Sequence, residues 1–337
     1  MNALRKLLFP LSVIYDGITL TRNLLFDNGI LPSQEYDFPV VGVGNLSMGG
    51  TGKTPMVEYI ISQLKDEYSL AVLSRGYGRK TSGYLKVNPD STTQQVGDEP
   101  LQIARKYSDV NVFVDEDRRH GMENLIKEAS PQVIVLDDVF QHRYVKPGFM
   151  VMLTSYEQLF YNDLVLPAGN LRESRKGAQR ASCIVVTKCP SQLSEERKHE
   201  IKTRIAKYSD APIFFSAIGY STTFHGSDNK ITAADLMNLT FTVVTGIAKP
   251  QPFVDYLFGL KLNFEHIAYG DHHDFSDSEI QKLDQLETII TTEKDYMRLR
   301  GKLKKAKVLY LPITTDFLGD EAAFNMMLSR FCEKVKR

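Results

Sequence analysis

A glycine-rich stretch before residue 55 holds the residue types best suited to chemistry in this chain. An apolar run, 39–43, precedes it and a helical pattern follows it, so the turn between them would wrap backbone N–H groups around the β- and γ-phosphates of a nucleotide. Lys53 would neutralise those phosphates, and the hydroxyl of Thr54 would ligate Mg²⁺. The nucleotide-binding residues that we expect are Asn45, Leu46, Ser47, Met48, Gly49, Gly50, Thr51, Gly52, Lys53 and Thr54.

One position departs from the general phosphate-loop pattern G-x-x-x-x-G-K-[ST], because its first glycine falls on Ser47. Gly49 and Gly50 offset this departure by keeping the loop permissive. A chance glycine-rich turn is the alternative interpretation. The strand before the loop, the helix after it and the Lys53-Thr54 pair at its end favour nucleotide binding.

Two adjacent carboxylates, Asp137 and Asp138, end a second apolar run at 133–136. A carboxylate at the carboxyl end of a strand near a phosphate loop holds Mg²⁺ or its water. A solvated turn is the usual alternative for paired aspartates, and the sequence leaves open which of the two would touch the metal. The metal ligands that we expect are Thr54, Asp137 and Asp138.

Base-recognition residues separate the classes of phosphate-loop protein. GTPases of this class carry [NT]KxD, whereas Thr187-Lys188-Cys189-Pro190 lacks the aspartate that would read guanine. Thr292-Glu293-Lys294-Asp295 has the required letters in the wrong register. The pattern therefore gives little support to a guanine-nucleotide switch and favours a kinase of small molecules.

Further polar clusters fall on loops at expected strand ends, where α/β folds place their sites. Phosphoryl transfer needs cations around the γ-phosphoryl group and a base for the acceptor hydroxyl. The side chains that fit these roles are Asp98, His272, Arg75, Arg118 and Arg172. An exposed turn is the alternative for each cluster. Asp271, His272 and His273 also suggest a metal site, although no zinc-like spacing accompanies them.

Short β-branched runs alternate with helical stretches from residue 38 onward, which predicts an α/β fold: a mostly parallel sheet of the phosphate-loop NTPase type covered by helices. The expected strands are 39–43, 70–74, 110–114, 133–136, 149–153 and 183–187, and the expected helices are 54–65, 117–129 and 194–208. A second, smaller α/β unit would contain strands 241–245, 288–292 and 308–311, a helix opened by Ser276 and Glu279, and a helix from Glu321 onward.

The expected organisation has four parts. Residues 1–36 form an amphipathic helix, 37–216 a phosphate-loop kinase core, 217–240 a linker or hairpin, and 241–337 the smaller domain. The 337 residues are 42% hydrophobic and carry 41 basic and 41 acidic side chains, so no net positive field supports nucleic-acid binding. Three cysteines give no even disulfide framework and favour a reducing compartment.

The amino-terminal residues show helical hydrophobic spacing without a span long enough to cross a bilayer. Arg5 and Lys6 precede Leu7-Leu8-Phe9, but the apolar stretch is short and no small-residue cleavage site follows, which argues against an export signal. An interfacial helix and a first helix packed on the core fit the pattern equally well.

Taken in order, these segments resemble the tetraacyldisaccharide 4′-kinases, enzymes of lipid A synthesis in Gram-negative bacteria. The resemblance spans nearly the whole chain and rests on residues 43–55, 74–79, 97–100, 136–142, 166–173, 245–248, 271–275 and 292–295. Two positions depart from the family pattern: Val139 replaces a glycine, which predicts a different backbone turn, and Ser174 replaces a proline. Neither departure removes a catalytic group.

The resemblance implies transfer of the ATP γ-phosphate to the 4′-hydroxyl of tetraacyldisaccharide 1-phosphate, giving lipid IVA. It implies Asp98 as the catalytic base with His272 paired to it. Lys53 would hold the β- and γ-phosphates, Thr54 and Asp138 the Mg²⁺, and Arg172 the charge that develops during transfer. ATP and Mg²⁺ are thus the expected cofactors, and closure between the two units would keep water from the γ-phosphate.

A substrate with four acyl chains also implies an enzyme bound peripherally to the cytoplasmic face of the inner membrane of a Gram-negative bacterium. Arg5, Lys6 and the apolar helix face would meet that anionic surface. We expect neither nucleic acid nor an obligate protein partner. The competing classes are a nucleotide-dependent switch, opposed by the missing guanine motif, and a kinase or ligase of a soluble acid, opposed by the amphipathic amino end.

Overall fold

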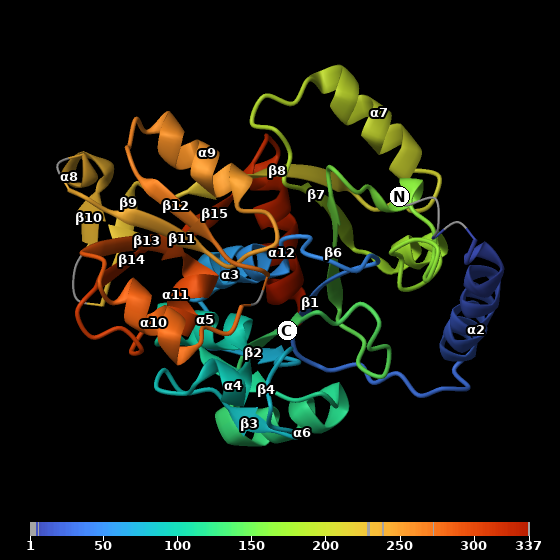
Figure 1. The fold of residues 1–337 in the computed structure, drawn as a ribbon. Coiled ribbons are helices and arrows are strands. Elements are labelled where there is room, and N and C mark those ends of the chain that lie inside the picture. The colour runs from blue at the N-terminus through green and yellow to red at the C-terminus, as the bar shows by residue number, and fades with distance from the viewer. Residues whose placement is uncertain (1–4, 6, 228–229, 238, 272, 336–337) are drawn as a thin grey trace.

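Two β-sheets with helices against them build the protein, which confirms the expected α/β class (Figure 1). The computed structural model describes residues 5, 7–227, 230–237, 239–271 and 273–335. Two residues of the sequence analysis, Lys6 and His272, lie outside this described part.

The larger sheet has nine strands in the order β15-β8-β7-β6-β1-β5-β2-β4-β3. Its strands are parallel from β8 to β4, and only the edge strands β15 and β3 pair antiparallel. The strands are β1 (Val40–Asn45), β2 (Leu70–Ser74), β3 (Leu85–Lys86), β4 (Asn111–Val114), β5 (Val133–Asp137), β6 (Phe149–Ser155), β7 (Cys183–Thr187), β8 (Ile213–Tyr220) and β15 (Ile313–Phe317).

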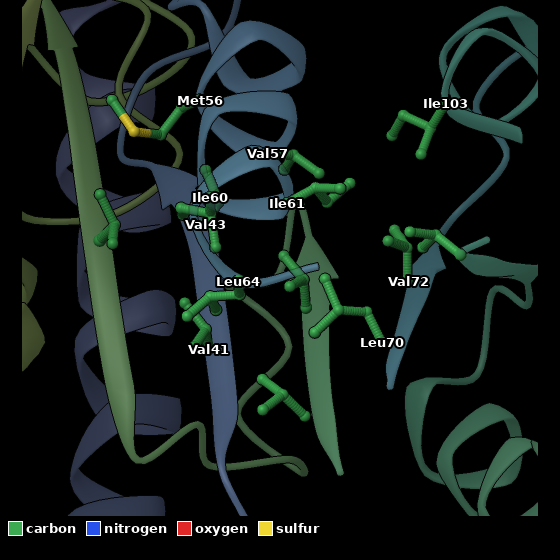
Figure 2. Close-up of a cluster of buried hydrophobic side chains, with 14 of the residues drawn as sticks. Val41, Val43, Met56, Val57, Ile60, Ile61, Leu64, Leu70, Val72 and Ile103 are labelled. Atoms are coloured by element: carbon green, nitrogen blue, oxygen red, sulfur yellow. The ribbon is translucent and has the colours of Figure 1, made fainter. Parts of the chain in front are cut away.

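Helices cover both faces of this sheet, as its uniformly buried central strands require. One face packs against α3 (Lys53–Leu64), α5 (Asp98–Lys106) and α12 (Glu321–Val335), the other against α6 (Arg118–Ala129) and α7 (Glu195–Ile205). Figure 2 shows Ile60 and Leu64 of α3 pointing toward Val41 and Val43 of β1, all of them at most 1% exposed. This packing fixes the start of α3 against the end of β1.

Side-chain caps mark where α6 and α7 begin. The side chain of Asp117 accepts hydrogen bonds from two backbone amides at the start of α6. The side chain of Ser194 accepts one from the backbone amide of Arg197 at the start of α7. Shorter helical turns fill the connections: α4 (Thr93–Val96), η1 (Phe160–Asn162) and η2 (Arg175–Arg180).

The smaller sheet has six strands in the order β10-β9-β14-β13-β11-β12. The antiparallel strands β9 (Thr223–His225) and β10 (Lys230–Thr232) lie within the expected linker or hairpin. The other elements are β11 (Thr242–Thr245), β12 (Glu265–Ala268), β13 (Thr288–Thr292), β14 (Lys307–Leu311), α8 (Ala233–Leu236), α9 (Gln251–Gly259), α10 (Asp277–Leu283) and α11 (Glu293–Leu299). Ser276 and Glu279 form the expected capping box of α10.

The end of the chain returns to the larger sheet, unlike the smaller domain of residues 241–337 that the sequence suggested. Strand β15 pairs antiparallel with β8, and Phe324, Leu328 and Cys332 of α12 lie in the core beside α3. The smaller sheet is therefore an insertion between β8 and β15, with both of its chain connections leading to one edge of the larger sheet.

Helix α2 (Phe9–Asp27) lies at the edge of the molecule opposite the smaller sheet (Figure 1). Within the described residues, no helix is both long and apolar enough to cross a membrane.

Candidate active site

The phosphate loop connects β1 to α3, as expected. Gly52 caps α3 with a φ of 85°, a left-handed conformation that favours glycine. At the other end, a Cβ on Gly44 would lie 2.8 Å from the backbone nitrogen of Phe140, so glycine allows the loop after β5 to approach. The buried Oγ1 of Thr51 has no hydrogen-bond partner within the described chain, which leaves a donor for a bound phosphate.

Residues 170–172 form backbone hydrogen bonds with the phosphate loop. The amide of Met48 donates to the carbonyl of Asn170 at 2.7 Å, and the amide of Arg172 donates to that of Leu46 at 2.7 Å. An isolated bridge between Ser47 and Leu171 completes the pairing. The segment 170–172 therefore brings the Arg172 side chain to the phosphate loop.

Lys53, Asp138 and Arg172 meet at the mouth of the loop. Lys53 Nζ lies 3.5 Å from Asp138 Oδ1, and Arg172 reaches both oxygens of that carboxylate, at 2.9 and 3.4 Å. Burial alone would raise the pKa of Asp138, but Lys53 and Arg172 outweigh it and lower that pKa far below its ordinary value. The side chain of Asn45 accepts hydrogen bonds from both cations.

Asp137 lies beside this cluster in a different environment. It is 6% exposed, and burial, Asp138 and Glu99 together raise its pKa to about 6. Ser74 donates to its Oδ2 at 2.9 Å, whereas its buried Oδ1 accepts no hydrogen bond from any described residue. Carboxylate and hydroxyl oxygens, the groups that Asp137, Asp138 and Thr54 carry, are the donors that Mg²⁺ prefers. The residues present therefore fit the metal.

The turn after β5 explains the departure at Val139. Asp138 adopts the left-handed conformation at this turn, with a φ of 49°. The Val139 side chain is 1% exposed in the hydrophobic core, and its amide donates to Val43 at 3.2 Å. The turn thus keeps the Asp138 carboxylate at the phosphate loop without a glycine at position 139.

The arginines suggested by the sequence occupy different places. Arg118 is 2% exposed and supports the backbone, donating to the carbonyls of Asp115 and Asp137. Burial lowers its pKa to about 10. Arg75 is exposed. Of the three candidates, only Arg172 contacts a carboxylate at the phosphate loop.

Asp98 begins α5, and its carboxylate is held from the smaller sheet. Arg298 of α11 donates to Asp98 Oδ2 through both Nε, at 3.0 Å, and Nη2. Nothing in the local sequence around Arg298 points to a partner 200 positions away. The expected pairing of Asp98 with His272 involves a residue outside the described part.

A buried network around Glu173 joins α2 to segment 170–172, and its members Asn23 and Arg180 are ones that the sequence pattern does not point to. Asn23 donates to Glu173 Oε2 at 2.7 Å, while Gln141 and Arg180 donate to Oε1 at 3.0 and 2.8 Å. The hydroxyl of Tyr15 donates to the carbonyl of Arg172 at 3.2 Å. The amino-terminal helix therefore contacts the candidate active site directly.

The two faces of α2 are inverted relative to a soluble amphipathic helix. Its buried residues are Ser12, Thr19, Asn23 and Phe26, most of them polar. Large apolar side chains are exposed instead, namely Phe9, Leu11, Val13, Ile14, Ile18 and Leu24. Arg5, which the sequence placed at an anionic surface, instead donates hydrogen bonds to Pro167, Gly169 and Asn170 of the protein. The polar contacts of α2 are thus internal and its apolar surface is external.

The fold and this site define a phosphate-loop kinase: a parallel sheet, a strand–loop–helix phosphate cradle, and paired carboxylates at the end of β5, the strand beside β1. The chain belongs to the LpxK family, tetraacyldisaccharide-1-P 4′-kinase, whose family model matches residues 4–333. This finding confirms the resemblance seen in the sequence and the ATP-dependent 4′-kinase activity that it implied.

Relatives and a solved structure agree over nearly the full length. The chain is 45% identical to the tetraacyldisaccharide 4′-kinase of Flavobacterium johnsoniae, with 99% of each chain covered. It is 42% identical to that of Bacteroides thetaiotaomicron, covering 94% of this chain and 90% of the relative. A crystal structure of LpxK from Aquifex aeolicus in complex with ATP matches with a TM-score of 0.80 and 30% identity, covering 97% and 99%.

Proposed function

We propose that this protein phosphorylates the 4′-hydroxyl of tetraacyldisaccharide 1-phosphate at the mouth of its phosphate loop, while α2 rests on the membrane that holds the lipid. The observation that carries this proposal is the cluster of Lys53, Asp138 and Arg172 at the loop that connects β1 to α3. Two cations and an ionised carboxylate there suit a nucleotide triphosphate and its metal.

The cations would share the charge of the triphosphate. Lys53 follows the loop directly, so its ammonium would contact the β- and γ-phosphates. Arg172 would stabilise charge on the γ-phosphoryl group during transfer, since it is already held beside Lys53 through Asp138. Thr54, Asp137 and Asp138 would hold Mg²⁺, which when bound supplies further charge neutralisation and orients the phosphates.

Asp98 would accept the proton of the 4′-hydroxyl as the new oxygen–phosphorus bond forms and the bond to the β-phosphate oxygen breaks. Asp98 lies in the first turn of α5, and Arg298 donates hydrogen bonds to its carboxylate. Both observations support a carboxylate with a fixed position in this role. His272 would pair with Asp98 and share the proton.

The inverted faces of α2 support the membrane part of the proposal. Exposed apolar side chains of this size are costly in water and gain free energy at a lipid surface. Because Tyr15 and Asn23 of the same helix contact the segment that holds Arg172, docking would place the active site at the surface where the substrate lies. The cytoplasmic face of the inner membrane, where ATP is available, is the proposed location.

Matched variants test the residue roles. Lys53→Ala should weaken ATP binding, whereas Asp98→Asn should leave ATP binding intact and lower kcat by about 10²–10⁴. Asp90→Asn, at an exposed turn before α4, is the control and should retain wild-type turnover. Full turnover in Asp98→Asn would exclude this carboxylate as the base. Unchanged ATP binding in Lys53→Ala would exclude the proposed nucleotide site.

A further inference from the structure

Arg298 lies where the smaller sheet meets α5. It belongs to α11, which follows β13, and its side chain is 8% exposed. Its partner Asp98 is the first residue of α5, with a side chain that is 12% exposed. The contact therefore joins the two parts of the fold through a largely buried guanidinium and carboxylate.

The guanidinium is fixed from its own side of the interface. Its Nη1 donates to the carbonyl of Gly246 at 3.3 Å and to Asp295 Oδ1 at 3.2 Å. Asp295 in turn accepts from the amide of Gly246 at 2.8 Å and from the hydroxyl of Thr292 at 2.7 Å. Because β11 ends just before Gly246 and α11 begins just after Thr292, the smaller sheet sets the position of the arginine.

The other two nitrogens of the Arg298 guanidinium, Nε and Nη2, face Asp98. Nε and Nη2 both donate to the same oxygen, Oδ2. A planar guanidinium with its other edge bonded inside the smaller sheet defines where that oxygen can lie, which a flexible lysine ammonium cannot do. Asp98 is therefore oriented by a residue of α11, the helix that follows β13 of the smaller sheet.

We propose that Arg298 is a positioning residue for Asp98: it holds the carboxylate in the orientation that accepts the proton of the 4′-hydroxyl. It does so only when α11 and the smaller sheet are packed against α5. This inference rests on the proposed role of Asp98. Proton transfer to a base depends steeply on position, and a displacement of about 1 Å can cost about 10²-fold in rate.

A neighbouring ion pair makes it possible to distinguish a positioning role of Arg298 from a general contribution to the contact between α11 and α5. Lys294, also on α11, lies 2.7 Å from Glu99, so it joins the same two helices without contacting Asp98 through a hydrogen bond. If Arg298 only helped to join α11 to α5, Lys294→Gln would lower turnover in the same way. If Arg298 positions the base, only the arginine variant should do so.

The test measures kcat and KM for lipid and ATP in the full-length protein. Arg298→Gln should lower kcat by about 10²-fold with the KM for ATP nearly unchanged, and Arg298→Lys, which keeps the charge without the fork, should remain impaired. Lys294→Gln should stay within about 3-fold of wild type. Equal losses in Arg298→Gln and Lys294→Gln, or full activity in Arg298→Gln, would overturn the proposal.

A double variant gives the decisive comparison. If Arg298 acts through Asp98, then Asp98→Asn with Arg298→Gln should turn over no more slowly than Asp98→Asn alone. If the two substitutions lower kcat independently, so that the double variant is slower than Asp98→Asn alone, Arg298 acts elsewhere and the positioning role is overturned. A failure of the proposed function itself would look different, because Asp98→Asn alone would then keep wild-type turnover.

Discussion

Asn23 of α2 and Glu173 beside the phosphate loop are joined by a 2.7 Å hydrogen bond, although they are 150 positions apart in the sequence. Glu173 is 1% exposed, so its carboxylate depends on Asn23, Gln141 and Arg180 for its hydrogen bonds. The bond ties a helix with an apolar outer face to the segment that carries Arg172. The proposed membrane-docking helix and the proposed phosphate site therefore share one buried hydrogen-bond network.

Removing the amide of Asn23 should destabilise the protein. Asn23→Ala leaves a buried carboxylate short of one donor, which costs about 1.5–3 kcal/mol for a hydrogen bond to a charged group. Thr21→Ala, on the exposed side of the same helix, should change stability by less than about 0.5 kcal/mol. Thermal unfolding of both variants checks this prediction, and equal midpoints would contradict it.

Charge on the outer face of α2 should release the protein from lipid. Ile14 and Ile18 are 61% and 64% exposed, so the pair of substitutions Ile14→Asp and Ile18→Asp should abolish sedimentation with anionic vesicles without changing ATP binding. Met326→Asp alters another exposed apolar side chain, on α12, which is 51% exposed, and should leave vesicle binding intact. Vesicle binding by the α2 variant, or its loss in the α12 control, would argue against α2 as the docking surface.

Glu293, which lies 3.5 Å from Lys106 of α5, should make the free energy of unfolding fall between about pH 4.5 and pH 8. Burial and the nearby Glu58 raise the pKa of Glu293 from 4.5 to about 8, with Lys106 only partly opposing them. The folded protein therefore binds more protons than the unfolded chain between these values, and the free energy of unfolding attributable to this group falls as pH rises through that window.

Glu293→Gln removes this titration, so its melting temperature relative to wild type should rise steadily from pH 5 to pH 8. Glu287→Gln, an exposed neighbour before β13, is the control and should show no such trend. A constant difference between Glu293→Gln and wild type across the range would contradict the buried, protonated carboxyl.

Hydrolysis of ATP without lipid should be slow. Asp98 begins α5, and its partner Arg298 comes from α11 beside the smaller sheet. The proposed base serves an acceptor hydroxyl rather than water. Phosphate release in the absence of acceptor should therefore remain about 10²-fold or more below lipid phosphorylation. Acceptor-free hydrolysis at the full rate would show that the site activates water freely.

The sequence predicted the central strands and the phosphate loop well because their signals are local. Strands such as β5 and β7 are buried at every position, so an apolar run is enough to find them. Gly52, Lys53 and Thr54 likewise reveal a strand–loop–helix turn by their spacing alone.

Contacts between residues that are far apart in the sequence leave no local pattern from which they could be predicted. Nothing local indicates that β15 returns to pair with β8 after the smaller sheet is complete, so the end of the chain was assigned to the wrong sheet. Arg298 looks like an ordinary basic residue in the last turn of α11, where cations are common. Asn23 looks like a polar interruption in a helix. Only tertiary packing shows that these two side chains bind Asp98 and Glu173.

Transfer of label from γ-labelled ATP into extractable lipid tests directly whether this protein is a 4′-kinase that uses its phosphate loop. The assay presents tetraacyldisaccharide 1-phosphate in detergent micelles to the wild-type protein and to Lys53→Ala. We expect label in the lipid with the wild-type protein and none with the variant. Label released only as inorganic phosphate, or equal lipid labelling by both proteins, would contradict this expectation.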